Sequence, residues 1–219
     1  MNIYLVVEGR VGEKKVYGFW VPLVNPALRI TDSIDDVTAD CVFIISGEGY
    51  PNYFEIISDA IEDVTTNPLF DRLVIAVDSE DMTYEDKKAE IQTFVAGHNR
   101  QIDYHIIIQH FCLETWALGN RVIITRNPAT PRIREYRRYF DVLTEDPQLM
   151  PDYPTEELNR SQFAEKYLRA LLNEKYRNLS YSKSNPEALL NALYFERVRS
   201  RYFDTGHIAS FGDFLDAFV

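Results

Sequence analysis

Carboxylate side chains follow four apolar segments within the first 120 residues. These segments have the composition of buried strands and lie at 3–7, 41–46, 73–77 and 104–108. Ligands of open parallel sheets bind outside the carboxyl ends of the strands, and sites built only from oxygen suit Mg²⁺ or Mn²⁺ better than Zn²⁺. The cysteines and histidines do not stand at the spacing of zinc ligands. The acids expected as metal ligands are Glu8, Asp78, Glu80, Asp81 and Glu114.

Three of these acids also have a plainer interpretation that the sequence leaves open. Glu8 fits a strand-exit carboxylate that accepts hydrogen bonds from nearby backbone amides. Glu114 is consistent with three roles: a metal ligand, a hydrogen-bond acceptor for another metal ligand, or an acid at a helix N-terminus that the helix dipole favours. Asp81 is either a substitute ligand for Glu80 or a turn residue. His110 follows the fourth apolar run and is interpreted as a surface or hydrogen-bonded histidine rather than a catalytic base.

Strand and helix patterns alternate over the first 125 residues, and a weaker strand candidate at 121–125 joins the four above. Helical patterns lie between the strands, at 13–24, 52–64 and 83–97. Pro51 is expected as the first residue of the second helix, and Thr83 as the N-cap of the third. The loop at 46–49 lacks the phosphate-loop motifs and is interpreted as a glycine-assisted turn. This alternation predicts an α/β fold with a mostly parallel sheet flanked by helices.

After residue 126 prolines interrupt the chain and helical patterns replace the strands. They are expected at 131–140, 161–177, 186–201 and 210–218. We therefore expect an α/β domain over residues 1–126 and a helical C-terminal extension over 127–219, packed on that domain.

The first of these C-terminal helices is basic. It carries Arg132, Arg134, Arg137 and Arg138, interleaved with tyrosines. Such a helix can contact the phosphates of a nucleic acid or form salt bridges with an acidic partner. A solvated helix face beside the acidic part of the chain is the plainer interpretation.

The charge of the chain is unevenly distributed. Its 219 residues have a formal net charge of −11. Residues 1–120 carry 8 Lys/Arg and 20 Asp/Glu, a balance of −12, whereas residues 121–219 carry 15 and 14. An acidic surface argues against nucleic-acid binding, and the neutral C-terminal part weakens that argument.

Several patterns in the sequence indicate the cellular compartment in which the protein is expected. No run of 18 apolar residues occurs, so we expect no transmembrane helix and no membrane partner. The N-terminus turns acidic at once, unlike a signal peptide. Cys41 and Cys112 lie in apolar sequence and are expected to be buried free thiols. Together these patterns favour a cytoplasmic protein.

Four strings of the sequence resemble a known family. They are V-E-G-x-x-x-E at 7–13, V-D-S-E-D at 77–81, C-L-E-T-W-A-L-G-N at 112–120 and Y-x-K at 181–183. A strand ending in Glu-Gly and a later strand ending in Asp-x-Asp, or a near variant, resemble the toprim fold of topoisomerases, bacterial primases and the nucleases of the overcoming-lysogenization-defect (OLD) family. The closer resemblance is to small RloB-like toprim proteins, often encoded beside ABC-type ATPases in bacterial antiviral loci. It covers residues 1–120 well and the rest loosely.

The resemblance implies a chemistry for the acids. Glu8 would act as general base or acid, and Asp78 with Glu80 would hold Mg²⁺ or Mn²⁺ during phosphodiester cleavage. Glu80 departs from the second aspartate of Asp-x-Asp, with Asp81 adjacent. The implied function is a metal-dependent nuclease that acts in antiviral defence and is controlled by an ABC-type ATPase partner. The alternative is an inactive toprim-fold protein that binds and regulates that ATPase.

Overall fold

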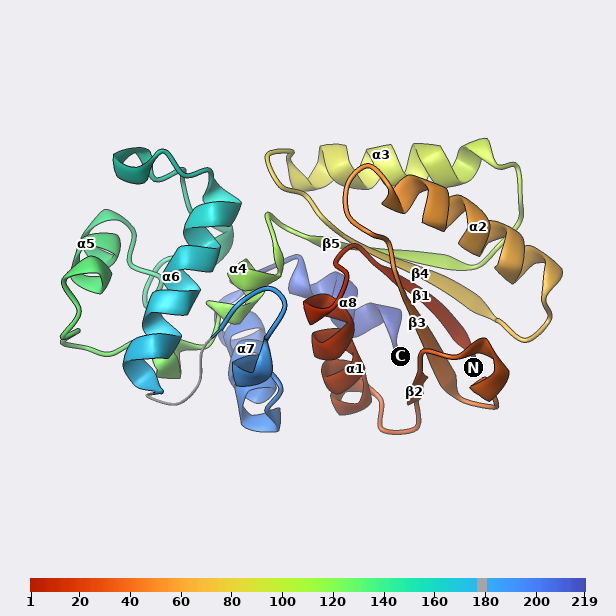
Figure 1. Ribbon diagram of the computed structural model, residues 1–219, viewed down its shortest axis with the longest axis horizontal. Helices are drawn as coiled ribbons and strands as arrows, with labels where there is room; N and C mark the ends of the chain where they lie inside the picture. The colour runs from red at the N-terminus through yellow and green to blue at the C-terminus, as the bar shows by residue number, and fades with distance from the viewer. Residues whose placement is uncertain (177–180) are drawn as a thin grey trace. The chain divides into compact units, whose positions relative to one another are not determined.

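The structure is a computed structural model and describes residues 1–176 and 181–219 (Figure 1). Within it the chain forms two compact units. Unit 1 comprises residues 1–77, 83–108 and 213–219, and unit 2 comprises residues 78–82 and 109–212.

Unit 1 is built on a five-stranded parallel sheet with the order β2-β3-β1-β4-β5. The strands are β1 (Ile3–Val7), β2 (Arg29–Thr31), β3 (Cys41–Ser46), β4 (Arg72–Asp78) and β5 (Tyr104–Gln109). Val7, the last residue of β1, is in register with Ser46 on one side and Ala76 on the other. The four strongest strand predictions and the α/β fold class are therefore confirmed.

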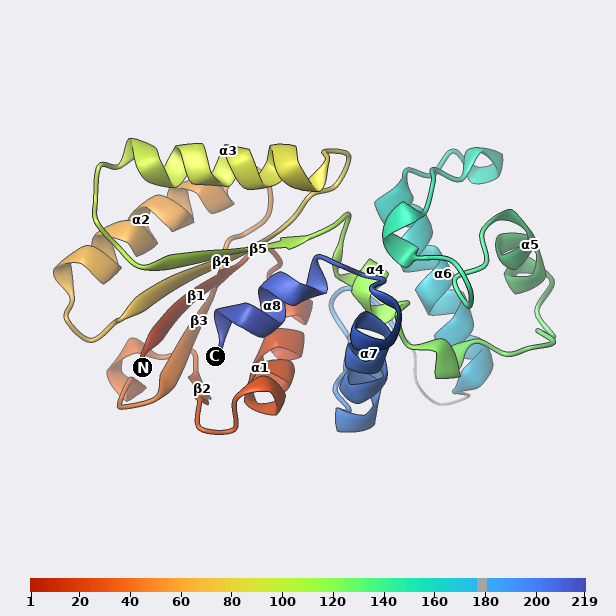
Figure 2. The same ribbon diagram turned by 180° about the vertical axis from the view of Figure 1, so that it is seen from behind.

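Helices cover both faces of this sheet, which gives unit 1 the three layers of a Rossmann-like fold (Figure 1). On one face lie α2 (Tyr53–Thr66) and α3 (Tyr84–Gly97), which share a buried core with the strands. On the other face α1 (Gly12–Val24) lies beside α8 (Phe211–Ala217), as Figure 2 shows from behind. There the ring of Phe214 packs edge-on against Tyr17 and Trp20, at centroid distances of 5.3 and 6.2 Å.

Two predictions from the sequence need correction, and one strand was not predicted. The apolar run at 121–125 is not a strand, because the Asn120 side chain accepts the Val122 N–H and begins a 3-10 turn, η2 (Arg121–Ile123). Strand β2 was missed, since three residues that include an exposed Arg29 show no strand periodicity. Pro51 precedes α2 instead of opening it, because Asn52 is the N-cap residue.

Unit 2 is helical. Its helices are α4 (Leu113–Ala117), α5 (Pro131–Tyr139), α6 (Arg160–Lys175) and α7 (Ala192–Thr205). Short 3-10 turns separate them, at η3 (Pro147–Leu149), η4 (Pro154–Glu156) and η5 (Glu187–Leu189), and a further turn, η1 (Ile34–Asp36), lies in unit 1. The aromatic rings of Tyr136, Tyr153 and Phe163 pack together at centroid distances of 4.7 to 5.2 Å and form a core between α5 and α6.

The helical C-terminal region is confirmed, with one correction. The helix predicted at 186–201 begins later, because the Asn191 side chain accepts the N–H groups of Leu193 and Tyr194 and starts α7 there. The predicted end of the preceding helix at Arg177 lies outside the described residues. Unit 2 also includes residues 109–126, so the division into domains at residue 126 stays a prediction.

Two smaller expectations can be compared directly with the structure. Cys41 and Cys112 are both free and buried, as predicted. None of the helices in the described ranges is both long enough and apolar enough to cross a membrane.

Candidate functional site

The segments that follow β4 and β5 lie side by side in unit 2. The Ser79 N–H donates to the Gln109 carbonyl at 3.1 Å, and the Glu80 N–H donates to the Phe111 carbonyl at 3.0 Å. A bond from the Met82 N–H to the Ser79 carbonyl closes a turn in which Glu80 adopts a left-handed conformation, with φ of 49°. This turn leaves Asp78 buried and exposes Glu80.

Glu114 is also buried in unit 2. It lies in the first turn of α4 with 2% of its surface exposed, and its Oε1 accepts a 2.8 Å hydrogen bond from the Tyr181 hydroxyl. Burial, followed by the charge of Glu114, raises the pKa of Tyr181 well above its usual value. The Thr115 hydroxyl donates to the His110 carbonyl at 2.6 Å and joins α4 to the residue that follows β5. Glu114 is thus held as a buried acceptor.

The pKa of the Cys112 thiol is affected by several charged side chains of unit 2. Burial raises the pKa of this thiol well above 9, and the negative charges of Glu114 and Asp78 raise it further. The positive charge of Lys183 acts in the opposite direction. Two carboxylates and a lysine from three separate segments therefore act on a single thiol.

Sequence reasoning did not select Lys183 or Tyr181 as site residues. The signal that pointed to them was the Y-x-K string at 181–183, which by itself carries little information. In unit 2 the Tyr181 hydroxyl of this string donates to Glu114 of the C-L-E-T-W string, and the charge of Lys183 lowers the pKa of Cys112. The hydrogen bond between Tyr181 and Glu114 joins positions 67 residues apart, so a local sequence pattern does not predict it.

Ser79 and His110 form a second polar contact beside Asp78. The Ser79 hydroxyl is fully buried and lies 2.9 Å from Nδ1 of the half-buried His110 ring. The backbone N–H of His110 donates to the Ser210 hydroxyl at 3.3 Å. His110 is therefore a hydrogen-bonded histidine, one of the two alternatives that the sequence favoured.

Glu8 belongs to unit 1, where it directly follows β1 with 8% of its surface exposed. Its N–H donates to the Ala76 carbonyl at 2.9 Å, and its own carbonyl accepts the Gly49 N–H at 3.0 Å. The Gly47 N–H donates to the Val7 carbonyl. The turn after β3, in which Glu48 and Gly49 both have positive φ, therefore lies across the end of β1.

A buried lysine lies in the same part of unit 1. Lys87 Nζ donates to the Tyr53 hydroxyl at 3.0 Å and to Glu90 Oε2 at 2.8 Å. Burial raises the pKa of Tyr53 to about 12, with Lys87 opposing the shift and the charge of Glu8 adding to it. Sequence reasoning missed Lys87, although its spacing from the buried Ile91 of α3 places it on the helix face that packs inward.

The expected metal ligands are thus divided between the units. Asp78, Glu80, Asp81 and Glu114 lie in unit 2, and Glu8 lies in unit 1. Among residues 1–176 and 181–219, no group of three or more His, Cys, Asp or Glu side chains is arranged to hold a metal ion. A metal site that uses these acids stays a prediction.

The arginines of α5 have two kinds of surroundings. Arg134 donates to the carbonyls of Pro128 and Ala129, and Arg137 pairs with Asp141 at 2.8 Å and donates to the carbonyl of Thr125. These two side chains hold the loop before the helix.

Three arginines of the same helix, Arg132, Arg134 and Arg138, are exposed, and of these Arg134 is the one that donates to the loop carbonyls. Arg132 lies 3.8 Å from Glu156, and Arg138 faces solvent. Nucleic-acid binding by the α5 arginines stays a prediction, and it now depends mainly on Arg132 and Arg138.

Comparison of the chain with protein-family models, with curated proteins and with solved structures found no match. The fold defines the chain as a Rossmann-like α/β protein with a helical unit. Its resemblance to RloB-like toprim proteins stays a prediction from four sequence strings.

Proposed function

We propose that this protein is a metal-dependent nuclease whose unit 2 holds a divalent cation with Asp78 and Glu114. The observation that carries the proposal is the burial of two carboxylates, Asp78 and Glu114, in the same unit, and the charges of both raise the pKa of the buried Cys112 thiol. Mg²⁺ keeps several waters and binds through one or two protein carboxylates together with substrate phosphates. Two carboxylates are therefore enough for such a site.

The burial of these acids supports a cation between them. Asp78 and Glu114 are 7% and 2% exposed, and buried carboxylates are costly unless positive charge or hydrogen bonds balance them. Tyr181 donates one hydrogen bond to Glu114. A divalent ion between the two carboxylates would balance their charge as well.

The remaining groups fit phosphodiester cleavage. Lys183 is exposed and positively charged, and an ammonium group binds phosphate oxygens as a point charge. A bound Mg²⁺ or Mn²⁺ would stabilise charge on the scissile phosphate and activate water. Glu8 as general acid or base, antiviral defence as the setting, and control by an ABC-type ATPase partner rest on the family resemblance alone.

Calorimetric titration of the 219-residue chain with Mn²⁺ tests the metal site. We expect Asp78→Asn to lose Mn²⁺ binding, because it removes one carboxylate while keeping the side-chain volume. Asp204→Asn, which changes an exposed acid of α7, is the matched control and should bind Mn²⁺ as wild type does. Equal binding by wild type and Asp78→Asn would contradict the proposed ligand.

Cleavage of labelled DNA and RNA with Mg²⁺ or Mn²⁺ tests the activity. Asp78→Asn should abolish cleavage. Lys183→Ala should slow cleavage while leaving Mn²⁺ binding in place, because its proposed partner is the phosphate. Cleavage by Asp78→Asn at the wild-type rate would contradict the nuclease assignment.

One observation favours a second function, that of an inactive protein which binds a partner ATPase. Glu80, the residue that departs from Asp-x-Asp, is exposed on a left-handed turn, whereas Asp78 is buried. If Mn²⁺ does not bind at millimolar concentration, this second function is the better explanation.

A further inference from the structure

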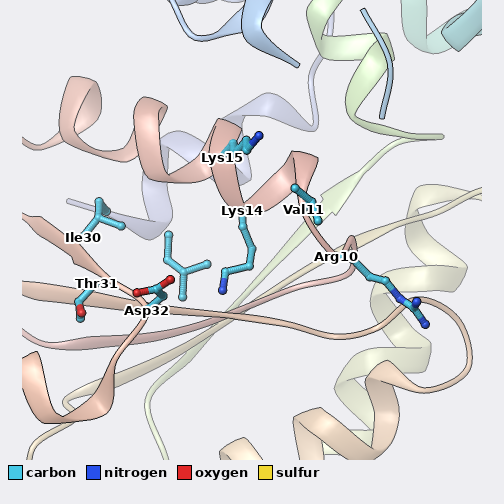
Figure 3. Close-up of a pocket in the computed structure, with 8 residues that line it drawn as sticks. Arg10, Val11, Lys14, Lys15, Ile30, Thr31 and Asp32 are labelled. Carbon is cyan, nitrogen blue, oxygen red and sulfur yellow. The ribbon is translucent and has the colours of Figure 1, made fainter. Parts of the chain in front are cut away.

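A cavity of about 400 Å³ opens in unit 1 beside the first turn of α1 and the end of β2 (Figure 3). This volume lies within the usual range for small-molecule sites, roughly 300–1,000 Å³. The cavity also lies where parallel sheets bind ligands, near the carboxyl ends of strands. None of the expected metal ligands lines it.

Positive charge is concentrated around this cavity. Arg10, Lys14 and Lys15 line it, and they are three of the eight Lys/Arg in residues 1–120, where acids outnumber bases by twelve. Lys14 extends from α1 into the cavity toward Asp32, whereas Lys15 points away from it (Figure 3). An anionic ligand would therefore meet Lys14 first.

Arg10 also lines the cavity, and its side chain extends away from Lys14 (Figure 3). Its Nε lies 2.8 Å from Glu48, with 70% and 45% of the two side chains exposed. An exposed ion pair of this kind contributes little stability. The guanidinium can exchange Glu48 for a phosphate and bind two of its oxygens at once.

The start of α1 adds donors on the same side. Val11 is the N-cap residue and lines the cavity, and its side chain makes no capping hydrogen bond. Glu13, the acid of the first turn, accepts the Gly9 N–H at 2.9 Å. Backbone N–H groups at a helix start favour anions.

The other residues that line the cavity indicate which kind of molecule carries the anionic group. Ile30 and Ile44 give the cavity an apolar wall, and Asp32 supplies a carboxylate that accepts hydrogen bonds. Inorganic phosphate would use neither feature. A planar base packs against aliphatic side chains, and its amino group or a ribose hydroxyl can donate to a carboxylate.

We propose that this cavity binds a nucleotide. Its phosphate would contact Lys14, Arg10 and the start of α1, and its base would lie against Ile30 and Ile44 with Asp32 as acceptor. The same chemistry serves a free nucleotide and the terminal nucleotide of a nucleic-acid strand. The proposal does not depend on the metal site or on nuclease activity.

Calorimetry of the 219-residue chain with AMP, GMP, CMP and UMP tests the proposal. At least one of the four should bind, and inorganic phosphate and the matching nucleoside should each bind at least about tenfold more weakly, since each lacks half of the contacts. Lys14→Ala should raise the Kd about tenfold, and Lys14→Arg should restore it in part. Lys175→Ala, an exposed lysine of α6, is the matched control and should leave the Kd unchanged.

Three results would overturn the proposal: no binding of any of the four at millimolar concentration, inorganic phosphate binding as tightly as the nucleotide, or an unchanged Kd in Lys14→Ala. Competition with short oligonucleotides then identifies the source of the nucleotide. Displacement by a 5′-phosphorylated strand but not by its 5′-hydroxyl form supports a strand end. Failure of both strands to displace the nucleotide supports a free nucleotide. Asp78→Asn should bind the nucleotide as wild type does, which separates this result from the metal-site test.

Discussion

Replacing Lys87 with methionine should destabilise the folded protein by about 1–3 kcal/mol. The Lys87 side chain is 5% exposed, and methionine fills most of the space of its apolar stem. The change removes a charged donor from Tyr53, whose hydroxyl then lies in a fully buried side chain without this bond. Glu90 is 32% exposed and regains water, which keeps the cost below the roughly 3–5 kcal/mol of a broken, fully buried ion pair.

A double-mutant cycle with Tyr53→Phe isolates the contact. Removing both polar groups avoids a buried hydroxyl without its donor, so the double variant should be more stable than the sum of the single changes predicts. Urea unfolding with a constant m-value gives the free energies. Lys175→Met, at an exposed site, is the control and should change stability by less than about 0.5 kcal/mol. A Lys87→Met variant within about 0.5 kcal/mol of wild type, or an additive cycle, would refute this reasoning.

Three further predictions concern the thiol, the tyrosines and one glycine. Cys112, whose pKa is raised well above 9, should resist iodoacetamide at pH 8 in the folded protein and react once urea unfolds it, whereas rapid alkylation of the folded protein would contradict its burial. Burial raises the pKa of Tyr53 and of Tyr136 to about 12, so folding binds their protons more tightly. The stability that this proton binding gives is present below about pH 10 and is lost as the pH rises to 12, at about 1.4 kcal/mol per pH unit for each group. Urea unfolding measures this loss, and absorbance at 295 nm follows the titration of the tyrosines. Unchanged stability between pH 10 and 12 would disprove this link. Gly47→Ala should lower the free energy of unfolding by about 1–3 kcal/mol, because its Cβ would lie 2.7 Å from the Tyr53 Cβ. Gly97→Ala is the control, since its Cβ meets open space in α3, and it should be neutral or stabilising. Similar melting temperatures for the two variants would count against the packing argument.

The sequence by itself determined the elements of the α/β unit. β1, β3, β4 and β5 could be predicted because each is a continuous apolar run, and such runs form strands that are covered on both faces. The Thr83 cap could also be predicted, since its hydroxyl accepts the Asp86 N–H three residues ahead. These features depend on neighbours close in sequence.

Only the tertiary structure decided which segments meet. The order that places β1 between β3 and β4 arises from pairing across long connections, which local periodicity does not encode. The run at 121–125 has the composition of a strand, yet a single asparagine side chain turns it into a 3-10 helix. Glu114 was predicted as a site residue, but its hydrogen bond to Tyr181 joins positions 67 residues apart. Lys87 likewise lies beside Tyr53, 34 residues away, because two helices pack on one face of the sheet. Contacts of this kind depend on how surfaces pack, and a linear pattern of residue types does not specify them.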